Sequence, residues 1–236
     1  MRAIILAAGR GTRISRHIDG KPKCTVLLAE GVTLIRYTVE LLMGRGIKDI
    51  ILVTGYEAGA IRSALEGLPV SYRDNPFFDV TNSIASLWFA KDLLDGSDSF
   101  VVLNGDVFLS PEALEIVLKE RRDPVLFYDT SRREEADYKF LCEGDRLLKY
   151  GKELPLNETS GEYIGCAVFS GDYASKYRVR LDELIAAQRH SAWWEDVLYS
   201  MAGEEAIFVK DVAGTFWGEV DFVEDYERIL GFYNRR

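Results

Sequence analysis

The chain has 236 residues, of which 47% are hydrophobic, and it carries a formal net charge of −9. This length and apolar content fit one large α/β domain, or two small ones, with a well-buried core. The negative charge argues against non-specific binding along a nucleic-acid backbone, because such binding needs clustered positive charge. Any bound anion must therefore be met by a local site.

The cysteines and the apolar runs indicate in which cellular compartment the protein is expected. Cys24, Cys142 and Cys166 are odd in number and lack both disulfide density and paired metal-ligand spacing, which predicts free thiols in a reducing environment. The apolar start is too short for a signal-peptide core, and no run approaches the roughly 18 apolar residues of a membrane-spanning helix. We therefore expect a soluble, cytoplasmic protein without membrane insertion.

The first half of the chain alternates between strands and helices. Strands are predicted at the apolar start and over 49–55, 69–73 and 99–106, and helices over 33–45, 58–66, 83–94 and 110–122. The last of these helices begins at Ser110-Pro111, a favourable N-cap and first-turn pair. This order predicts a mainly parallel sheet covered by helices on both faces.

After residue 124 the pattern changes to short strands with turns between them. These strands are predicted over 125–129, 138–143, 146–150 and 163–169, and two helices follow near 181–203 and 222–234. The sequence thus predicts one three-layer α/β domain, 1–236, in which a mixed, mainly parallel twisted sheet is flanked by helices. We expect residues 1–123 to form a nucleotide-binding half and residues 124–236 an acceptor-binding half.

A glycine-rich loop follows the first strand, where parallel sheets place their ligands. The loop, AAGRGTR, contains Gly9, Gly11, Thr12 and Arg13, and Lys23 follows in KPKC. Glycines let backbone amides approach an anion, while the hydroxyl and the cations supply hydrogen bonds and charge. The loop lacks the Gly-Lys-Ser/Thr ending of a Walker loop and the third glycine of a dinucleotide fingerprint. We interpret it as a phosphate-binding loop, with a plain strand-to-loop turn as the alternative.

The motifs LAAGRGTR and KPKC together resemble the signature of nucleotidyltransferases of the sugar-phosphate type. VTGY at 53–56, NGD at 104–106 and WGEVDFVEDYE at 217–227 follow in the order of that family. NPFFDVTNSIASL and WWED look most similar to bacterial cytidylyltransferases that act on phosphocholine and related small phosphates or phosphonates. The resemblance implies a GT-A-like, Rossmann-type fold and a magnesium-dependent transfer reaction.

The resemblance also implies roles for single residues. Arg13 and Lys23 match the cations that grip the triphosphate and neutralise the α-phosphate, and Asp106 and Asp221 match the two aspartates that hold Mg²⁺. An ionised acceptor phosphate can attack the α-phosphorus in line without a general base. The residues expected to bind the nucleotide are Leu6, Ala7, Ala8, Gly9, Gly11, Thr12, Arg13, Lys23, Gly55, Asn82, Ser86 and Gly105. The alternatives are a loop-capping aspartate for Asp106, an N-cap for Asp221, and an N-cap or a buried helix residue for Asn82. Glu219 and Asp225 are expected to be solvated or structural.

The acceptor end is predicted from aromatic and charged residues. Lys152 resembles the lysine that meets the acceptor phosphate in relatives, with a solvated turn lysine as the alternative. Tyr138, Trp193, Trp194 and Glu195 could form a cage for a quaternary ammonium through cation–π attraction and a carboxylate. Adjacent tryptophans on a helix point about 100° apart, so at most one is expected to line the pocket while the other packs in the core.

Together these expectations describe a magnesium-dependent cytidylyltransferase that transfers CMP from CTP to a small phosphorylated acceptor, first of all phosphocholine. 2-Aminoethylphosphonate, another phosphonate, inositol 1-phosphate and a sugar 1-phosphate stay open as acceptors. A non-catalytic nucleotide-sensing domain and a dinucleotide-dependent oxidoreductase are the alternatives of other classes. The missing third glycine disfavours the oxidoreductase. The aromatic content of 12% leaves room for a homodimer contact.

Overall fold

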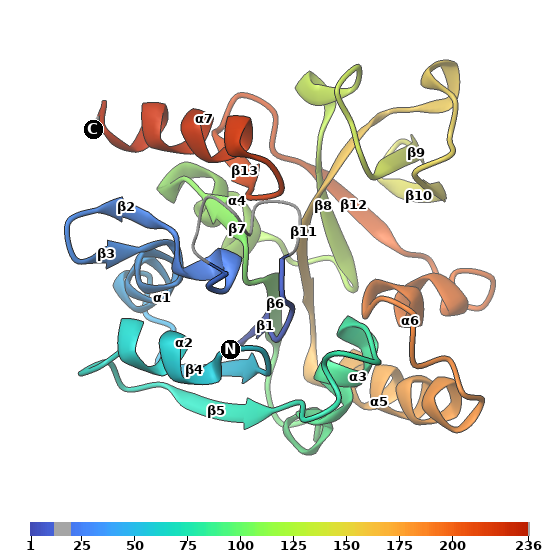
Figure 1. Cartoon of the computed structure of the whole chain (residues 1–236). Coiled ribbons are helices and arrows are strands. Elements are labelled where there is room, and N and C mark those ends of the chain that lie inside the picture. Colours follow the sequence, from blue (N-terminus) through green and yellow to red (C-terminus); the bar gives the residue numbers. More distant parts are fainter. Residues whose placement is uncertain (12–19, 236) are drawn as a thin grey trace.

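The computed structural model describes residues 1–11 and 20–235 and contains one large sheet with helices on both faces (Figure 1). The strands of this sheet follow one another in the order β5-β4-β1-β6-β11-β8-β12-β10-β9. In chain order they are β1 (Arg2–Ala7), β4 (Asp49–Thr54), β5 (Ser71–Asp74), β6 (Phe100–Asn104), β8 (Val125–Asp129), β9 (Lys139–Glu143), β10 (Arg146–Gly151), β11 (Gly161–Phe169) and β12 (Phe208–Asp211).

Strands β5, β4, β1 and β6 are parallel and form the half of the sheet that the alternating pattern predicts. Strand β1 shows why they are apolar throughout, since Ile4 and Leu6 enter one hydrophobic core while Ala3 and Ile5 enter the other. A strand buried on both faces has no polar side to alternate with. The carboxyl ends of these strands meet at one edge of the sheet.

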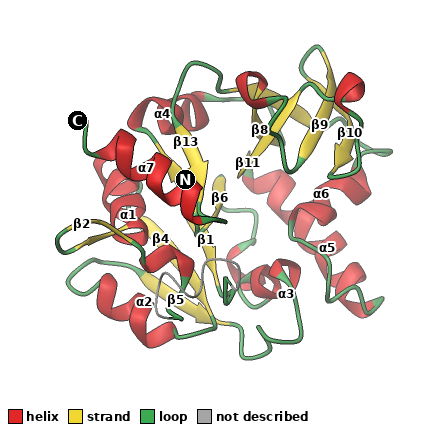
Figure 2. Cartoon of the chain, turned by 45° about the horizontal axis from the view of Figure 1, so that its top comes forward, coloured by secondary structure: helices red, strands yellow, loops and turns green. Residues whose placement is uncertain are grey.

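The helices divide between the two faces, as the view in Figure 2 also shows. Helices α1 (Leu34–Gly44), α2 (Ala58–Ala64) and α4 (Pro111–Lys119) pack on one face, and α3 (Ser83–Trp88), α5 (Gly171–Ala186) and α6 (Glu195–Met201) pack on the other. Helix α7 (Val223–Tyr233) covers a third, smaller core together with the 26–34 segment. No helix of the described residues is long and apolar enough to cross a membrane.

The single helix predicted near 181–203 is wrong, because the structure has α5 and α6 with a turn between them. Gln188 adopts a left-handed backbone conformation with a φ of 63°, which ends α5. Trp193 and Trp194 therefore precede α6 instead of lying on a helix. Likewise, α3 ends at Trp88, and a short 3₁₀ turn over Lys91–Leu93 replaces the rest of the predicted helix.

The second half of the sheet is mixed, and β11 joins it to the first half. Residues Cys166 to Phe169 of β11 pair antiparallel with β6, whereas Gly161 and Glu162 pair with β9. An irregularity in the pairing with β8 separates these two parts at Gly165, which has a φ of +73°. Because β9 hydrogen-bonds to both β10 and β11, the strands β11, β8, β12, β10 and β9 close into a ring.

Two short two-stranded sheets were not predicted. Strand β7 (Val107–Leu109) pairs with β13 (Trp217–Glu219), and β2 (Leu27–Ala29) pairs with β3 (Val32–Thr33). Strand β12 was also missed, although it lies inside the large sheet, parallel to β8. The pairing of β7 with β13 matters most, because it brings residues 106 and 221 together from distant parts of the chain.

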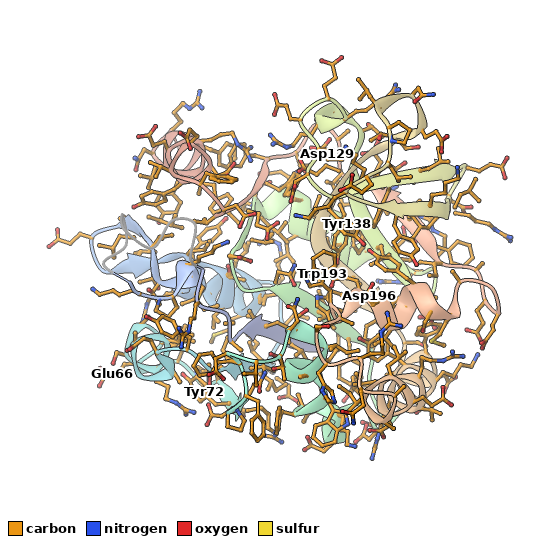
Figure 3. The ribbon with its side chains drawn as sticks, turned by 45° about the vertical axis from the view of Figure 1, so that its right-hand side comes forward. Glu66, Tyr72, Asp129, Tyr138, Trp193 and Asp196 are labelled. Carbon is orange, nitrogen blue, oxygen red and sulfur yellow. The ribbon has the colours of Figure 1, made fainter. Side chains whose placement is uncertain are left out.

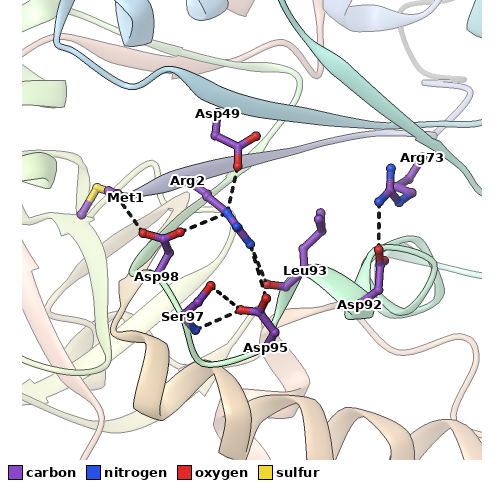
Figure 4. A network of polar contacts seen from close by, with 9 residues as sticks. All are labelled: Met1, Arg2, Asp49, Arg73, Asp92, Leu93, Asp95, Ser97 and Asp98. Atoms are coloured by element: carbon purple, nitrogen blue, oxygen red, sulfur yellow. Dashed lines mark hydrogen bonds and ion pairs between the residues drawn. The ribbon is translucent and has the colours of Figure 1, made fainter.

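A cluster of charges lies at the amino end of β1, away from the carboxyl ends (Figure 4). The Arg2 guanidinium forms ion pairs with Asp49 at 2.8 Å and with Asp98 at 3.2 Å, and it lies 3.9 Å from Asp95. It also donates to the Leu93 carbonyl at 3.3 Å. Arg2 thereby connects β1, the start of β4 and the loop that leads into β6.

Candidate active site

A cavity of about 380 Å³ opens at the carboxyl ends of β1 and β6. Its wall on one side is the loop after β1, and its floor is the Asn104–Asp106 segment at the end of β6. Residues of the 78–86 segment border one end of the cavity, and residues of β11 and the loop before α6 border the other end. Ligands of parallel sheets bind at this edge.

Lys23, Asp106 and Asp221 meet at the centre of this cavity. The Lys23 ammonium lies 3.4 Å from a carboxylate oxygen of Asp106 and forms a short ion pair with Asp221. The β7–β13 pairing continues as a hydrogen bond from the Val220 amide to the Asp106 carbonyl at 3.0 Å, which fixes the two aspartates side by side. One lysine and two aspartates from three distant segments of the chain are thus in contact with one another.

Glu219 adds a third carboxylate to this group. The carboxyl oxygens of Asp106, Glu219 and Asp221 lie within 4.8 Å of one another. Burial raises the pKa of Asp106, and Asp221 adds to the rise although Lys23 opposes it. Burial, followed by Asp106 and Asp221, also raises the pKa of Glu219 well above its ordinary range. So dense a negative cluster favours a cation.

The Lys23 ammonium neutralises part of the negative charge of these carboxylates. Burial alone would lower the pKa of Lys23, but Asp106, Asp221 and Glu219 outweigh burial and raise it. The lysine is therefore a permanent ammonium at neutral pH. Gly11, whose φ is +64°, lies directly against this lysine, so a side chain at position 11 would collide with the aliphatic part of Lys23.

The donor set also fits a divalent cation. Three carboxylates that can approach one ion provide the hard oxygen ligands preferred by Mg²⁺, which typically takes one or two protein carboxylates together with substrate phosphates. Asp106 and Asp221 are the residues that would hold the ion, with Glu219 beside them. No histidine or cysteine belongs to this group among the described residues.

Most of the residues predicted to bind the nucleotide line the cavity. Gly105 packs closely, since a Cβ there would lie 2.9 Å from the Ala7 Cβ. Asn82 caps α3 by accepting from the Ser83 amide, and Ser86 is buried and accepts from the Asn75 side chain at 3.1 Å. The predicted nucleotide-binding residues found in the wall are Leu6, Ala7, Ala8, Gly9, Gly11, Lys23, Asn82, Ser86 and Gly105. Thr12 and Arg13 lie outside the described residues.

Two predicted contacts need correction. Gly55 does not line the cavity; it packs behind the loop, where a Cβ would lie 2.8 Å from Phe78 and 2.9 Å from the Ala8 carbonyl. Trp194 is 0% exposed and belongs to the hydrophobic core, so it is not a wall of the acceptor pocket. The expectation that only one of the two tryptophans reaches the pocket is thereby met by Trp193.

The other end of the cavity is aromatic and acidic. Tyr138 and Trp193 form an edge-to-face pair with ring centroids 5.5 Å apart, and Figure 3 shows both near Asp196. The Trp193 amide donates to the Asp196 carboxylate at 2.8 Å. Glu195 is buried in the cavity wall, and burial raises its pKa to about 8. Lys152 also lines the cavity and pairs with Asp137 at 2.6 Å.

Several wall residues were missed by sequence reasoning. Glu219 was expected to be solvated or structural, yet the period of a strand places it on the same face as Asp221, and this alternation could have revealed it. Tyr163 and Asn104 line the cavity at its aromatic end. Gly165 lines it too, and a glycine inside the run YIGCAVF is the usual sign of a bulge, a feature common beside active sites.

Known proteins are similar to this chain in sequence and in fold. The chain is 26% identical over 231 residues to the choline-phosphate cytidylyltransferase of Streptococcus pneumoniae, covering 97% of this chain and 96% of that protein. It is 34% identical over 119 residues to the CMP-5'-(3-aminopropyl)phosphonate synthase of Streptomyces rubellomurinus, covering 49% of this chain and 18% of that protein. The solved CTP:phosphocholine cytidylyltransferase from Streptococcus pneumoniae matches with a TM-score of 0.79 and 23% identity, covering 98% of both chains.

These findings confirm the predicted α/β fold class and the resemblance carried by the glycine-rich loop. The described part of the loop, the paired aspartates and Lys23 all face one cavity. The model of the MobA-like NTP transferase domain matches residues 3–199. The chain therefore belongs to the MobA-like NTP transferase family and is a nucleotidyltransferase.

Proposed function

We propose that this nucleotidyltransferase is a magnesium-dependent cytidylyltransferase, and that its acceptor is a small phosphate or phosphonate with an organic cation at its other end. Phosphocholine is the first candidate, giving CDP-choline and pyrophosphate. The observation that carries the proposal is the continuity of one cavity, from Lys23, Asp106 and Asp221 to the Tyr138–Trp193 pair and the buried Glu195.

The choice of cytidine rests on two relatives. The proteins from Streptococcus pneumoniae and Streptomyces rubellomurinus both carry names that describe cytidylyl chemistry. Asn82 and Ser86, at the start of α3, are the polar side chains that we assign to the nucleoside end. Neither forms a pattern that distinguishes cytosine from other bases, so the experiment below includes every common triphosphate.

The reaction is an in-line displacement at the α-phosphorus. An acceptor oxygen forms a new bond to this phosphorus, the bond to the bridging oxygen breaks, and pyrophosphate leaves with the electron pair. Transfer of this kind depends on positioning and charge neutralisation more than on covalent help from the protein. Lys23 supplies a fixed positive charge beside the cavity floor, and the ionised acceptor needs no base. Magnesium, when held by Asp106 and Asp221, supplies further neutralisation of phosphate charge.

The acceptor end has the chemistry that an organic cation requires. The faces of Tyr138 and Trp193 attract a cation through their ring quadrupoles, and Glu195 provides the opposite charge. Lys152 lies in the same wall and is the candidate partner of the acceptor phosphate, for which it would have to leave or share Asp137.

The test is product formation, followed by mass spectrometry. The purified protein receives Mg²⁺, each of the four ribonucleoside triphosphates or dTTP, and a pool of acceptors. The pool contains phosphocholine, phosphoethanolamine, 2-aminoethylphosphonate, inositol 1-phosphate and common sugar 1-phosphates. A CDP-linked cationic product supports the proposal. A uridylyl or other nucleotidyl sugar would overturn the cytidine and cation assignments, and the absence of any product would favour a nucleotide-sensing domain.

A further inference from the structure

An ion pair between Asp137 and Lys152 lies in the wall of the cavity. The Lys152 ammonium is 2.6 Å from a carboxylate oxygen of Asp137, and both residues line the cavity. The side chain of Asp137 is 61% exposed and that of Lys152 is 36% exposed. An ion pair so open to water contributes little by itself. The position of the Lys152 ammonium therefore depends on the groups that hold the backbone on either side of the pair.

Lys139, the first residue of β9, holds the turn that carries Lys152. Its ammonium donates to the Lys152 carbonyl at 3.0 Å and to the Leu154 carbonyl at 3.1 Å. Hydrogen bonds from a charged donor are stronger than those between neutral groups. Lys139 does not line the cavity. Its contribution to the site is thus indirect, because it binds the main chain of the turn from which the Lys152 side chain extends.

Glu162, on β11, holds the other partner of the ion pair. One of its carboxylate oxygens accepts from the Asp137 amide at 2.9 Å, and the other accepts from the Arg132 Nε at 2.7 Å. Glu162 is buried, and an ionised group without partners is costly to bury. Its hydrogen bonds to Arg132 and Asp137 therefore satisfy the carboxylate and fix the backbone of Asp137 at the same time.

Lys139 and Glu162 act from one position of the sheet. They lie opposite each other in the antiparallel pairing of β9 with β11, and opposite residues of such a pair place their side chains on the same face. Their charges are opposite, yet each side chain holds a different segment. From this position Lys139 reaches the 152–154 turn, and Glu162 reaches the backbone of Asp137.

We propose that Lys139 and Glu162 are positioning residues for the acceptor phosphate. Lys139 holds the turn of Lys152 and Glu162 holds Asp137, so that the Lys152 ammonium stays at the cavity wall, where the phosphate takes over or shares it. The link to acceptor binding rests on the proposed function, whereas the link between Lys139 and the 152–154 turn does not.

The first experiment measures KM for phosphocholine and for CTP. Lys139→Met removes the ammonium and keeps an unbranched side chain. We expect the phosphocholine KM to rise roughly three- to tenfold, the equivalent of one lost hydrogen bond, with the CTP KM unchanged. Lys139→Arg should restore most of the binding, because a guanidinium can also donate to two carbonyls. Lys149→Met is the matched control, since it removes the same charge from the neighbouring strand β10, where Lys149 pairs with Glu158.

A second variant keeps the inference testable if Lys139→Met does not fold. Glu162→Gln keeps the shape of the side chain but leaves it one acceptor oxygen, so it cannot accept from Asp137 and Arg132 through separate oxygens. It should also raise the phosphocholine KM. Unchanged phosphocholine KM values in both folded variants would overturn the positioning role.

The second experiment repeats both substitutions in a Lys152→Met background. Residues that act through the Lys152 ammonium have nothing left to position once that ammonium is gone. We therefore expect neither substitution to raise the phosphocholine KM any further. A further increase of the original size would mean that Lys139 and Glu162 act through another part of the wall, such as Tyr138, and would overturn the inference.

The third experiment tests the turn without any substrate. A lysine-specific protease cleaves after Lys152 more readily when the turn opens, and mass spectrometry follows the cleavage. We expect faster cleavage there in Lys139→Met than in the wild type, and a rate close to the wild type in Lys139→Arg. Equal rates in all three proteins would overturn the role of Lys139. Faster cleavage, together with a phosphocholine KM that Lys152→Met leaves unchanged, would instead count against the acceptor contact of the proposed function.

Discussion

The carboxyl groups of the candidate site differ in which neighbouring groups balance their negative charge. Asp106 and Asp221 share the Lys23 ammonium, whereas Glu195 is buried in the cavity wall, and burial raises its pKa to about 8. The first arrangement keeps charges in place for phosphate chemistry, and the second leaves a carboxyl whose protonation changes within the physiological range. The consequences can be tested one residue at a time.

Replacing Asp106 by Asn should abolish most turnover without unfolding the protein. The substitution keeps the shape of the side chain but removes one of the charges that we assign to the metal, so kcat should fall on the order of 100-fold or more. Initial rates and a thermal melt measure the two effects. Asp182→Asn is the control, because that aspartate pairs with Lys91 outside the cavity and should leave kcat unchanged. A fully active Asp106→Asn enzyme would refute the metal assignment.

Binding of a cationic acceptor should improve as the pH rises toward about 8, the pKa of Glu195. Below this pH the carboxyl must lose its proton before it can oppose the cation, so KM should fall by up to about tenfold per pH unit. The same linkage makes folding less favourable as the pH rises from about 4.5 to about 8, because the folded state holds a proton that the unfolded chain has released.

The comparison of wild type with Glu195→Gln isolates this effect from the titration of the acceptor phosphate. The variant should show a flatter dependence of KM on pH. Parallel profiles for the two proteins would mean that Glu195 does not titrate on acceptor binding.

At the scale of elements, strand β11 shapes the acceptor end through its irregularity at Gly165. The residues before it pair with β9 and those after it pair with β6, so the strand changes neighbours where it passes the cavity. A side chain at Gly165 would face both a strained φ and contacts of 2.8 Å with Val107 and 3.0 Å with Asn104. Position 165 therefore requires glycine for two reasons, its backbone conformation and the lack of space for a side chain.

Gly165→Ala should lower the free energy of unfolding by roughly 2–4 kcal/mol, the sum of left-handed strain and crowding. Gly144→Ala is a matched control, because Gly144 has a φ of +59° but nothing within 4 Å of an added Cβ. It should cost only about 1–2 kcal/mol. Urea unfolding of both variants provides the measurement, and equal losses would show that the contacts at Gly165 relax without cost.

The elements also show what the sequence could and could not predict. Buried runs such as those of β1, β4, β6 and β8 are readable because their apolar length is a local property. The pairing of β7 with β13 depends on residues more than 100 positions apart, and it is this pairing that places Asp221 beside Asp106. The burial of Trp194 and the exposure of Trp193 were also unreadable in detail, since neighbouring identical residues differ only in the packing around them.

At the scale of the whole molecule, the candidate active site and the Arg2 ion-pair cluster lie at opposite ends of the parallel strands. The cavity lies at the carboxyl ends of the parallel strands, while the Arg2 cluster joins β1, β4 and the loop before β6 at their amino ends. A change at Arg2 should thus affect folding without affecting the chemistry.

Arg2→Met should lower the free energy of unfolding by about 1 kcal/mol and leave kcat unchanged. The guanidinium serves several acceptors at once, but its partners are half-exposed, so the loss should shrink at high salt. Lys119→Met is the comparison, because this exposed lysine has one helical partner, Glu115, and should cost less. A large fall in kcat for Arg2→Met would show that the two ends of the sheet are coupled.

The closed ring of strands has a consequence for contacts between molecules. Unpaired backbone at the margin of a sheet can recruit a strand from another chain, which is a common route to aggregation. Because β9 is bonded on both sides, that margin is largely occupied, and β5 at the other end of the sheet has β4 as its neighbour. Strand β5 is four residues long and carries Arg73 and Asp74, which form ion pairs with Asp92 and Arg62. A short strand with charged side chains discourages the addition of a strand from another chain. The free edge of β5, which the ring does not close, is therefore protected against such pairing.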